Sequence, residues 1–390
     1  MRSTHPGHLV LTLAVALAVA QGGTAPPAAP ETRAFDAAVL QGIRRGAFPG
    51  AALVVGRTDT ILYAEGYGRL TWADGAPAVT PDSTLYDLAS LTKVIATTTA
   101  LMLLLDRGAV DLDAPVGRYI PEFRGGGREA ITLRHLLTHT SGLPATLPLH
   151  REARDSAAAL AMVLAVGPRQ RPGVRVVYSD VNAILLGEVV RRVAGEPLDR
   201  FVTREIFAPL GLTQLVFRPP RRLHPRIAPT GVWRGHPVAG VVNDPGAAKL
   251  GGVAGHAGAF GTALDVARFA QFMLREGTLS DGRRLLRAQT VRLFTTRVPP
   301  PGPGQDSRAL GWQAVPTDEE VSSAGTQFGA RSYGHTGWTG TSLWIDPDRR
   351  VFVVLLTNRA YAPRARRSFT VLKEVRGAVA DAAARVVDAR

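Results

Sequence analysis

Apolar and polar positions near the N-terminus predict one helix followed by two strands. Residues 35–45 place their apolar side chains at the spacing of a single helix face. Two short apolar runs, 51–55 and 61–66, flank the polar turn Arg57-Thr58-Asp59-Thr60. The pattern therefore predicts a helix over 35–45 and a β-hairpin over 51–66.

The C-terminal region repeats these two elements in the opposite order. The runs 342–345 and 351–357 flank Asp346-Pro347-Asp348 and predict a second hairpin, and an amphipathic helix follows from about 367 to 387. A two-stranded hairpin alone is only marginally stable in water. We therefore expect both hairpins to join one antiparallel sheet, which the terminal helices cover.

The middle of the chain, about 107–300, favours helices and Pro/Gly-rich loops. A helix that is apolar nearly all round begins at Ser90 and extends to about Asp106, which predicts a buried central position. We expect an α+β fold, with a sheet built from both termini and an inserted, mostly helical lobe, and a cleft between the lobes as the natural place for chemistry. The expected boundaries are one domain over 31–390, with a sheet lobe of about 31–88 and 305–390 and a helical lobe of about 89–304.

Residues 1–30 are predicted to be a signal peptide and linker. Arg2 gives a positive start, Leu9 to Ala20 is a short apolar run, and Ala18-Val19-Ala20 has the small-x-small pattern of a cleavage site. A run of this length is too short for a membrane span, although an uncleaved anchor is the alternative. We expect cleavage near Ala20-Gln21, a secreted or periplasmic protein, and no integral membrane segment after cleavage.

Composition removes several classes of function. The chain has no Cys, which excludes disulfides, thiol catalysis and thiolate metal sites. The net charge is +14, but no Lys/Arg run is interleaved with aromatic residues, so a nucleic-acid partner is not expected. Attraction to anionic cell-wall polymers or lipid headgroups stays open. We expect a monomer that acts on a small-molecule or peptide substrate.

Ser90 and Lys93 form the one Ser-x-x-Lys pair in the chain. Only three of the 46 basic residues are lysines, and chance predicts about 0.1 such pairs in a chain of this composition. At the start of a helix, positions i and i+3 share a face, so the Lys93 amine is expected near the Ser90 hydroxyl. Lysine acts as a base only when its pKa is lowered, and burial by the apolar helix would lower it. A helix cap with a surface lysine is the alternative.

Two further clusters carry candidate site residues. Tyr178-Ser179-Asp180 follows a strand-like run, 174–177, and precedes an apolar helix; Tyr178 can relay a proton, whereas Asp180 alone would be read as a helix cap. Gly334-His335-Thr336-Gly337-Trp338 precedes the predicted strand at 342, where glycines let a ligand approach the backbone and a backbone N–H can bind an oxyanion. A glycine-rich turn with a packed Trp is the alternative for this last cluster.

Taken in order, Ser90-Leu-Thr-Lys93, Tyr178-Ser-Asp180 and His335-Thr-Gly337 resemble the three motifs of serine beta-lactamases and penicillin-binding proteins. Those motifs are Ser-x-x-Lys, Tyr-x-Asn and Lys-Thr-Gly, and the spacing here fits the class C beta-lactamase-like branch. The segments 136–144 and 251–258 also resemble serine hydrolases of that branch. The resemblance covers about 35–385 and implies the beta-lactamase/transpeptidase-like fold.

The resemblance also implies roles for the site residues. Ser90 would be the nucleophile, and Lys93 and Tyr178 would share the work of the base, with the primary base left open. The N–H groups of Ser90 and Trp338 would bind the oxyanion, and Asp180, His335, Thr336 and Gly337 would bind substrate. No metal or cofactor is expected.

Asp180 stands where the family has Asn, and His335 where it has Lys. Both changes make the cleft less favourable for the carboxylate of a beta-lactam. The expected function is therefore an exported serine hydrolase acting on a small ester, a D-amino-acid peptide or a related cell-wall-type substrate. A true beta-lactamase, or a catalytically weak binding or scaffold member of the same fold, is the alternative.

Other candidates are weaker. Ser141 and His139 lie in a segment without a Gly-x-Ser-x-Gly motif, and His135 and His139 lack the glutamate of a metalloprotease helix, so both histidines and Ser141 are interpreted as loop structure. His256 between glycines is more often a packed or hydrogen-bonded turn residue than a ligand, although it can line a cleft. Asn243-Asp244-Pro245 is interpreted as a turn.

Overall fold

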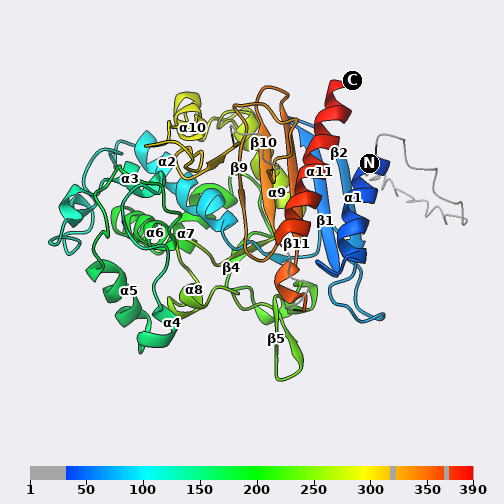
Figure 1. Ribbon diagram of the computed structural model, residues 1–390, viewed down its shortest axis with the longest axis horizontal. Coiled ribbons are helices and arrows are strands. Elements are labelled where there is room, and N and C mark those ends of the chain that lie inside the picture. Colours follow the sequence, from blue (N-terminus) through cyan, green and yellow to red (C-terminus); the bar gives the residue numbers. More distant parts are fainter. Residues whose placement is uncertain (1–31, 317–321, 364–368, 390) are drawn as a thin grey trace, which may run out of the picture.

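The computed structural model describes residues 32–316, 322–363 and 369–389. The chain forms a sheet with helices on both faces and a helical lobe beside it (Figure 1). The first and last described helices, α1 (Arg33–Arg44) and α11 (Phe369–Asp388), lie on the sheet side of the molecule (Figure 1). The predicted signal peptide, 1–30, lies outside the described residues. Among the described helices, none has the length and apolar character needed to cross a bilayer.

The main sheet has six antiparallel strands in the order β2-β1-β11-β10-β9-β8. Strands β1 and β11 from opposite ends of the chain pair in its centre, from Ala51 opposite Thr357 to Arg57 opposite Val351. This confirms the predicted sheet from both termini. The strands are β1 (Gly50–Arg57), β2 (Ile61–Gly68), β8 (Gln313–Ala314), β9 (Tyr333–Thr336), β10 (Ser342–Asp346) and β11 (Val351–Thr357).

Strand β1 is buried on both faces, so its alternate side chains enter two different cores. Leu53 and Val55 pack with the terminal helices α1 (Arg33–Arg44) and α11 (Phe369–Asp388), whereas Ala52 and Val54 belong to the larger core that includes α9 (Ala263–Leu274). Helix α9 therefore covers the face of the sheet opposite α1 and α11. Burial of this strand on both faces explains its continuous apolar sequence.

The helical lobe is built around the helix that follows Ser90. Its first turns, Lys93–Thr98, are π-helical and continue into α2 (Thr99–Asp106), and nearly all of their side chains are buried. The predicted buried helix is thus confirmed, with a π-helical opening that apolar periodicity does not reveal. The other helices of the middle region are α3 (Leu133–Leu137), α4 (Leu149–Glu152), α5 (Ser156–Ala165), α6 (Asp180–Ala194), α7 (Leu198–Val202), α8 (Pro245–Lys249) and α10 (Ala288–Thr295).

The middle region also contains short strands that the sequence pattern missed. Strands of two or three residues form a small sheet in the order β3-β7-β4 and the hairpin β5–β6, and they are too short to show alternation. The strand-like run 174–177 is not a strand, because its backbone bonds to loops instead. The short strands are β3 (Tyr86–Asp87), β4 (Val216–Phe217), β5 (Gly231–Trp233), β6 (His236–Val238) and β7 (Ala259–Gly261).

Candidate active site

Ser90 lies in a tight turn between β3 and the buried helix. Ala89, just before it, has a φ of 47°, a left-handed conformation that is uncommon for a residue with a Cβ. The buried carboxylate of Asp87 holds this turn, because it accepts hydrogen bonds from the N–H of Ala89 at 2.8 Å and from the N–H of Asn243 at 2.6 Å. The strained turn places Ser90 on the wall of a cleft of about 640 Å³.

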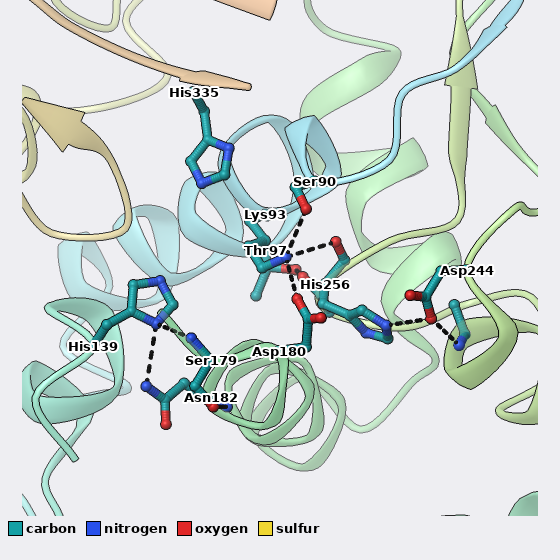
Figure 2. A network of polar contacts seen from close by, with 12 residues as sticks. Ser90, Lys93, Thr97, His139, Ser179, Asp180, Asn182, Asp244, His256 and His335 are labelled. Atoms are coloured by element: carbon teal, nitrogen blue, oxygen red, sulfur yellow. Dashed lines mark hydrogen bonds and ion pairs between the residues drawn. The ribbon is translucent and has the colours of Figure 1, made fainter. Parts of the chain in front are cut away.

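Lys93 lies one turn after Ser90 and is almost completely buried. Its Nζ donates to Ser90 Oγ at 2.9 Å, to Asp180 Oδ1 at 2.8 Å and to the backbone oxygen of His256 at 3.2 Å (Figure 2). The predicted proximity of the amine to the hydroxyl is therefore confirmed, and the alternative of a surface lysine is wrong. Three acceptors around one amine are the coordination that an ammonium group prefers.

The protonation of Lys93 differs from what the sequence led us to expect. Burial lowers the pKa of Lys93, but attraction to Tyr178 and Asp180 outweighs burial, and the net pKa is raised above its usual value. The expectation of a lowered pKa considered burial alone and did not count the carboxylate of Asp180 as a partner. Lys93 is consequently an ammonium ion in the resting site.

Tyr178 occupies the centre of a group of rings and cations. Its ring lies 4.7 Å from that of His139 and 5.9 Å from that of His335, measured between centroids. Lys93 Nζ lies 5.0 Å, and the guanidinium carbon of Arg308 5.1 Å, from the ring of Tyr178. The ring of Tyr178 thus lies between two histidine rings and within about 5 Å of two cationic groups.

A buried hydrogen-bond network fixes the backbone that carries Tyr178. His139 Nδ1 accepts from the N–H of Ser179 at 3.1 Å and from Nδ2 of Asn182 at 3.2 Å, and Ser141 Oγ donates to Asn182 Oδ1 at 2.6 Å. Burial, followed by the charges of Arg308 and Lys93, holds the pKa of His139 well below its usual value, so its ring is neutral. His139 and Ser141 do lie in a loop, but they position the second cluster.

The third cluster spans the end of β9 and the start of the loop 337–341, which joins β9 to β10. The N–H of Gly337 donates to the Thr341 oxygen at 2.7 Å and closes the loop. Thr339 Oγ1 donates to the Asp87 oxygen at 2.7 Å, and Thr341 Oγ1 donates to the Leu88 oxygen at 3.0 Å. These two threonines fix the loop against the segment that leads into Ser90, although the loop and that segment lie about 250 residues apart in sequence.

Two backbone donors in this region have no acceptor. In the described part of the chain, nothing accepts a hydrogen bond from the N–H of Ser90 or of Trp338, and both residues line the cleft. Backbone N–H groups are nearly always paired in folded proteins unless water or a ligand takes their place. A pair of such donors beside a hydroxyl suits a carbonyl oxygen that develops negative charge.

His335 lines the cleft as a neutral ring. Its Nδ1 donates to the backbone oxygen of Thr336 at 2.9 Å, and its buried Nε2 has no partner among the described residues. Burial, together with the charges of Lys93 and Arg308, holds the pKa of His335 well below its usual value. A neutral ring with a buried Nε2 therefore stands at the position where the resembling family has a lysine.

Asp180, Asp244 and His256 form a polar group on the side of Lys93 away from His335 (Figure 2). His256 Nε2 and Asp244 Oδ1 are 2.8 Å apart, and potential ligand atoms of the three residues lie within 4.8 Å of one another. Such a group can in principle hold a metal ion. However, the ammonium of Lys93 already occupies Asp180 and would repel a cation, so we interpret the group as a hydrogen-bond network.

Three residues of the cleft were not predicted as site residues. Asp244 caps α8 and bonds to His256, which lines the cleft and whose carbonyl holds Lys93; both had been interpreted mainly as turn structure. Arg308 lies in a loop without any motif, so no sequence signal could have found it. The remaining predicted residues, Asp180, Thr336, Gly337 and Trp338, all line the same cleft as Ser90 and Tyr178.

Comparisons with known proteins agree with this geometry. The family model "Beta-lactamase" matches residues 35–376. The chain is 33% identical over 359 residues to a protein of Escherichia coli K12 named "Putative D-alanyl-D-alanine carboxypeptidase", a match that covers 82% of this chain and 80% of that protein.

Solved structures show the same fold. A penicillin-binding protein homologue from Caulobacter crescentus has a TM-score of 0.71 at 22% identity and covers 93% of this chain and 99% of that one. A class C beta-lactamase from Rhodobacter sphaeroides has a TM-score of 0.69 at 24% identity, and the match covers 90% of this chain and 99% of the Rhodobacter chain. The chain therefore belongs to the Beta-lactamase family and has the fold of class C beta-lactamases and penicillin-binding proteins.

Proposed function

We propose that the protein is an exported serine hydrolase that forms an acyl-enzyme on Ser90. The observation that carries this proposal is the contact of Lys93 Nζ with Ser90 Oγ at 2.9 Å, in a cleft where the N–H groups of Ser90 and Trp338 face no acceptor among the described residues. A nucleophile, a charged partner and two free donors are the groups that acyl transfer requires.

In this proposal Ser90 Oγ attacks the substrate carbonyl while its proton passes to the oxygen of Tyr178. Lys93 remains an ammonium ion and stabilises the phenolate of Tyr178, because its raised pKa makes it a poor proton acceptor. The carbonyl oxygen becomes an oxyanion bound by the two N–H groups. Collapse of this intermediate expels the leaving group, which takes the proton from Tyr178, and water then hydrolyses the acyl-enzyme by the reverse proton path.

The substrate is proposed to be a small ester or a D-amino-acid peptide. Arg308 favours the second candidate, a D-alanyl carboxypeptidase, because it is a buried cation that lines the cleft and forms no ion pair with a described carboxylate. Arginine suits the terminal carboxylate of a peptide. The relative from Escherichia coli has a name of that class. Export rests on the pattern of residues 1–30 and is tested by fractionating cells that express the full chain.

The test of this function is covalent labelling followed by substitution. Wild-type protein incubated with a fluorophosphonate should carry one adduct on Ser90, located by peptide mass spectrometry. Ser90→Ala should lose both the adduct and the hydrolysis of p-nitrophenyl acetate while keeping its thermal unfolding temperature. Ser141 and Ser179 are internal controls, since both hydroxyls are buried and engaged in hydrogen bonds. An adduct on either of them would contradict the assignment, and no adduct at all would favour a binding or scaffold role.

A further inference from the structure

Arg376 on α11 is a buried cation that the proposed chemistry does not use. Only 5% of the residue is exposed, and it forms no ion pair with a carboxylate in the parts of the chain that the structure describes. Its Nε has no hydrogen-bond partner there either. Burying a guanidinium without a carboxylate is costly, and the cost must be offset by what the group does bind.

The partners of Arg376 are two backbone oxygens of the loop 337–341. Its Nη2 donates to the oxygen of Thr341 at 2.7 Å and to that of Gly337 at 3.4 Å. The Thr341 oxygen also accepts from the N–H of Gly337, and the Gly337 oxygen accepts from the N–H of Gly340 at 3.1 Å. Arg376 thus joins the two ends of the loop, and it does not itself line the cleft that Trp338 lines.

The contact with Gly337 bears directly on an oxyanion donor. The oxygen of Gly337 and the N–H of Trp338 belong to the same planar peptide group, in which the two bonds point in opposite directions. A cation that fixes the oxygen therefore also fixes the direction of the N–H. A charge at the oxygen further polarises the peptide and makes its N–H a stronger donor. We propose that Arg376 is a positioning residue that presents the Trp338 N–H to the oxyanion.

Neighbouring contacts are consistent with this role. Arg359, also buried, donates from Nη2 to the oxygen of Trp338 at 2.9 Å, so the next peptide of the loop is held in the same way. Burial, and then the nearby charge of Arg359, lowers the pKa of Arg376 to about 9, which leaves Arg376 charged at neutral pH. Arg376 does not line the cleft, so it acts through the loop and does not touch substrate.

The inference rests on the proposed function, and its test separates the two. Arg376→Met and Arg376→Lys are compared with wild type for kcat and KM on p-nitrophenyl acetate and for the Kd of phenylboronic acid, whose adduct on a serine places an oxygen in the oxyanion site. Arg297→Met is the matched control. Arg297 is half-buried and likewise donates to backbone oxygens, those of Val315 and Ala330, but it lies outside the cleft.

We expect Arg376→Met to lower kcat by about 10- to 100-fold, less than the roughly 10²–10³-fold typical of deleting an oxyanion donor. The Kd of phenylboronic acid should rise by a similar factor, while KM changes by less than about threefold, because the oxyanion exists in the transition state and in the adduct but not in bound substrate. Arg376→Lys should recover part of both losses, since an ammonium keeps the charge and one donor. Arg297→Met should keep kcat and boronate affinity even if it unfolds at a lower temperature.

The inference is overturned if folded Arg376→Met keeps wild-type kcat and boronate affinity, or if Arg297→Met loses as much of both. Should Arg376→Met fail to fold, Arg376→Gln, which keeps an N–H donor but no charge, decides by the same criteria. Wild-type protein that neither labels with fluorophosphonate nor binds phenylboronic acid would overturn the proposed function and this inference together. If wild-type protein labels with fluorophosphonate but Arg376→Met keeps wild-type kcat and boronate affinity, this inference is overturned and the proposed function stands.

Discussion

Each central residue of the site has partners that decide what it can do. Lys93 is the clearest example, because burial alone would make it a neutral base, whereas Asp180 and Tyr178 raise its pKa and keep it an ammonium. Asp180 is consequently more than a replacement for asparagine, since it helps to keep Lys93, the residue beside Ser90, positively charged. His335 has the opposite character, because burial and the charges of Lys93 and Arg308 keep its ring neutral.

Asp180→Asn should move the alkaline limb of the pH–rate profile to lower pH. Tyr178 and Asp180 both raise the pKa of Lys93 against burial, so removing the carboxylate of Asp180 lowers that pKa, and the ammonium is lost at a lower pH. The measurement is kcat/KM for a p-nitrophenyl ester across the pH range, corrected for spontaneous hydrolysis. If the acidic limb moves instead, neutral Lys93 is the base, and our assignment of Tyr178 is wrong.

Beta-lactam hydrolysis should be weak compared with ester hydrolysis. Asp180 places a negative charge in the cleft and neutral His335 supplies no positive one, although Arg308 offsets part of this deficit. The double change Asp180→Asn with His335→Lys should raise nitrocefin turnover relative to p-nitrophenyl acetate turnover by about tenfold or more, since a close charge near a protein surface is worth about 1–4 kcal/mol before screening. Wild-type nitrocefin turnover that equals ester turnover would show that the enzyme is a beta-lactamase.

At the scale of elements, the site depends on contacts between segments that are distant in sequence. The loop between β9 and β10 is fixed by threonine contacts to the end of β3, so both proposed oxyanion donors belong to one rigid unit. Close packing at Gly337 is part of that unit. A Cβ there would lie 2.1 Å from Thr341 Oγ1 and 2.8 Å from the Leu88 oxygen, closer than atoms can approach.

Gly337→Ala should therefore lower kcat/KM by about 10²-fold, because the loop must move away from Ser90 and take the Trp338 N–H with it. The measurement is ester hydrolysis together with thermal unfolding. Gly75→Ala is the control, since a Cβ at that surface position meets nothing within 4 Å. Wild-type activity in Gly337→Ala would mean that the loop does not carry an oxyanion donor.

At the scale of the whole molecule, the site lies where the sheet meets the helical lobe. Asp87 is buried at this junction and holds both the turn before Ser90 and the segment at Asn243. Burial raises the pKa of Asp87 to about 6, although the two backbone hydrogen bonds act in the opposite direction. The stability of the fold is thereby coupled to the ionisation of a residue that holds the turn before Ser90.

This coupling predicts a specific pH dependence of stability. The pKa of Asp87 is higher in the folded protein than in the unfolded chain, so the folded state binds the extra proton between about pH 4 and pH 6. Its contribution to the free energy of unfolding is present below pH 4 and falls by up to about 3 kcal/mol as the pH rises to 6. Urea unfolding of wild type and Asp87→Asn is measured at several pH values. The free energy of unfolding of wild type minus that of Asp87→Asn should fall by up to about 3 kcal/mol over this window. A constant difference from pH 4 to 7 would contradict the raised pKa.

The sequence by itself determined the main elements and the proximity of Ser90 and Lys93. Alternating and helical apolar spacing is a local property, so the terminal hairpins, the terminal helices and the buried helix after Ser90 could be predicted from it. The pair Ser90 and Lys93 could be predicted for the same reason, because three residues along a helix are always neighbours. The resemblance of the three motifs then indicated which distant segments meet.

Tertiary structure alone decided the charges and the supporting contacts. Lys93 has its raised pKa because Asp180 approaches it from another helix, and no local pattern encodes that distance. Arg308 and Arg376 contact residues far away in the chain, and each looks like an ordinary surface charge in the sequence. Electrostatic energy depends on separation and burial in three dimensions, whereas periodicity records only neighbours along the chain, so the nucleophile could be predicted and its chemical environment could not.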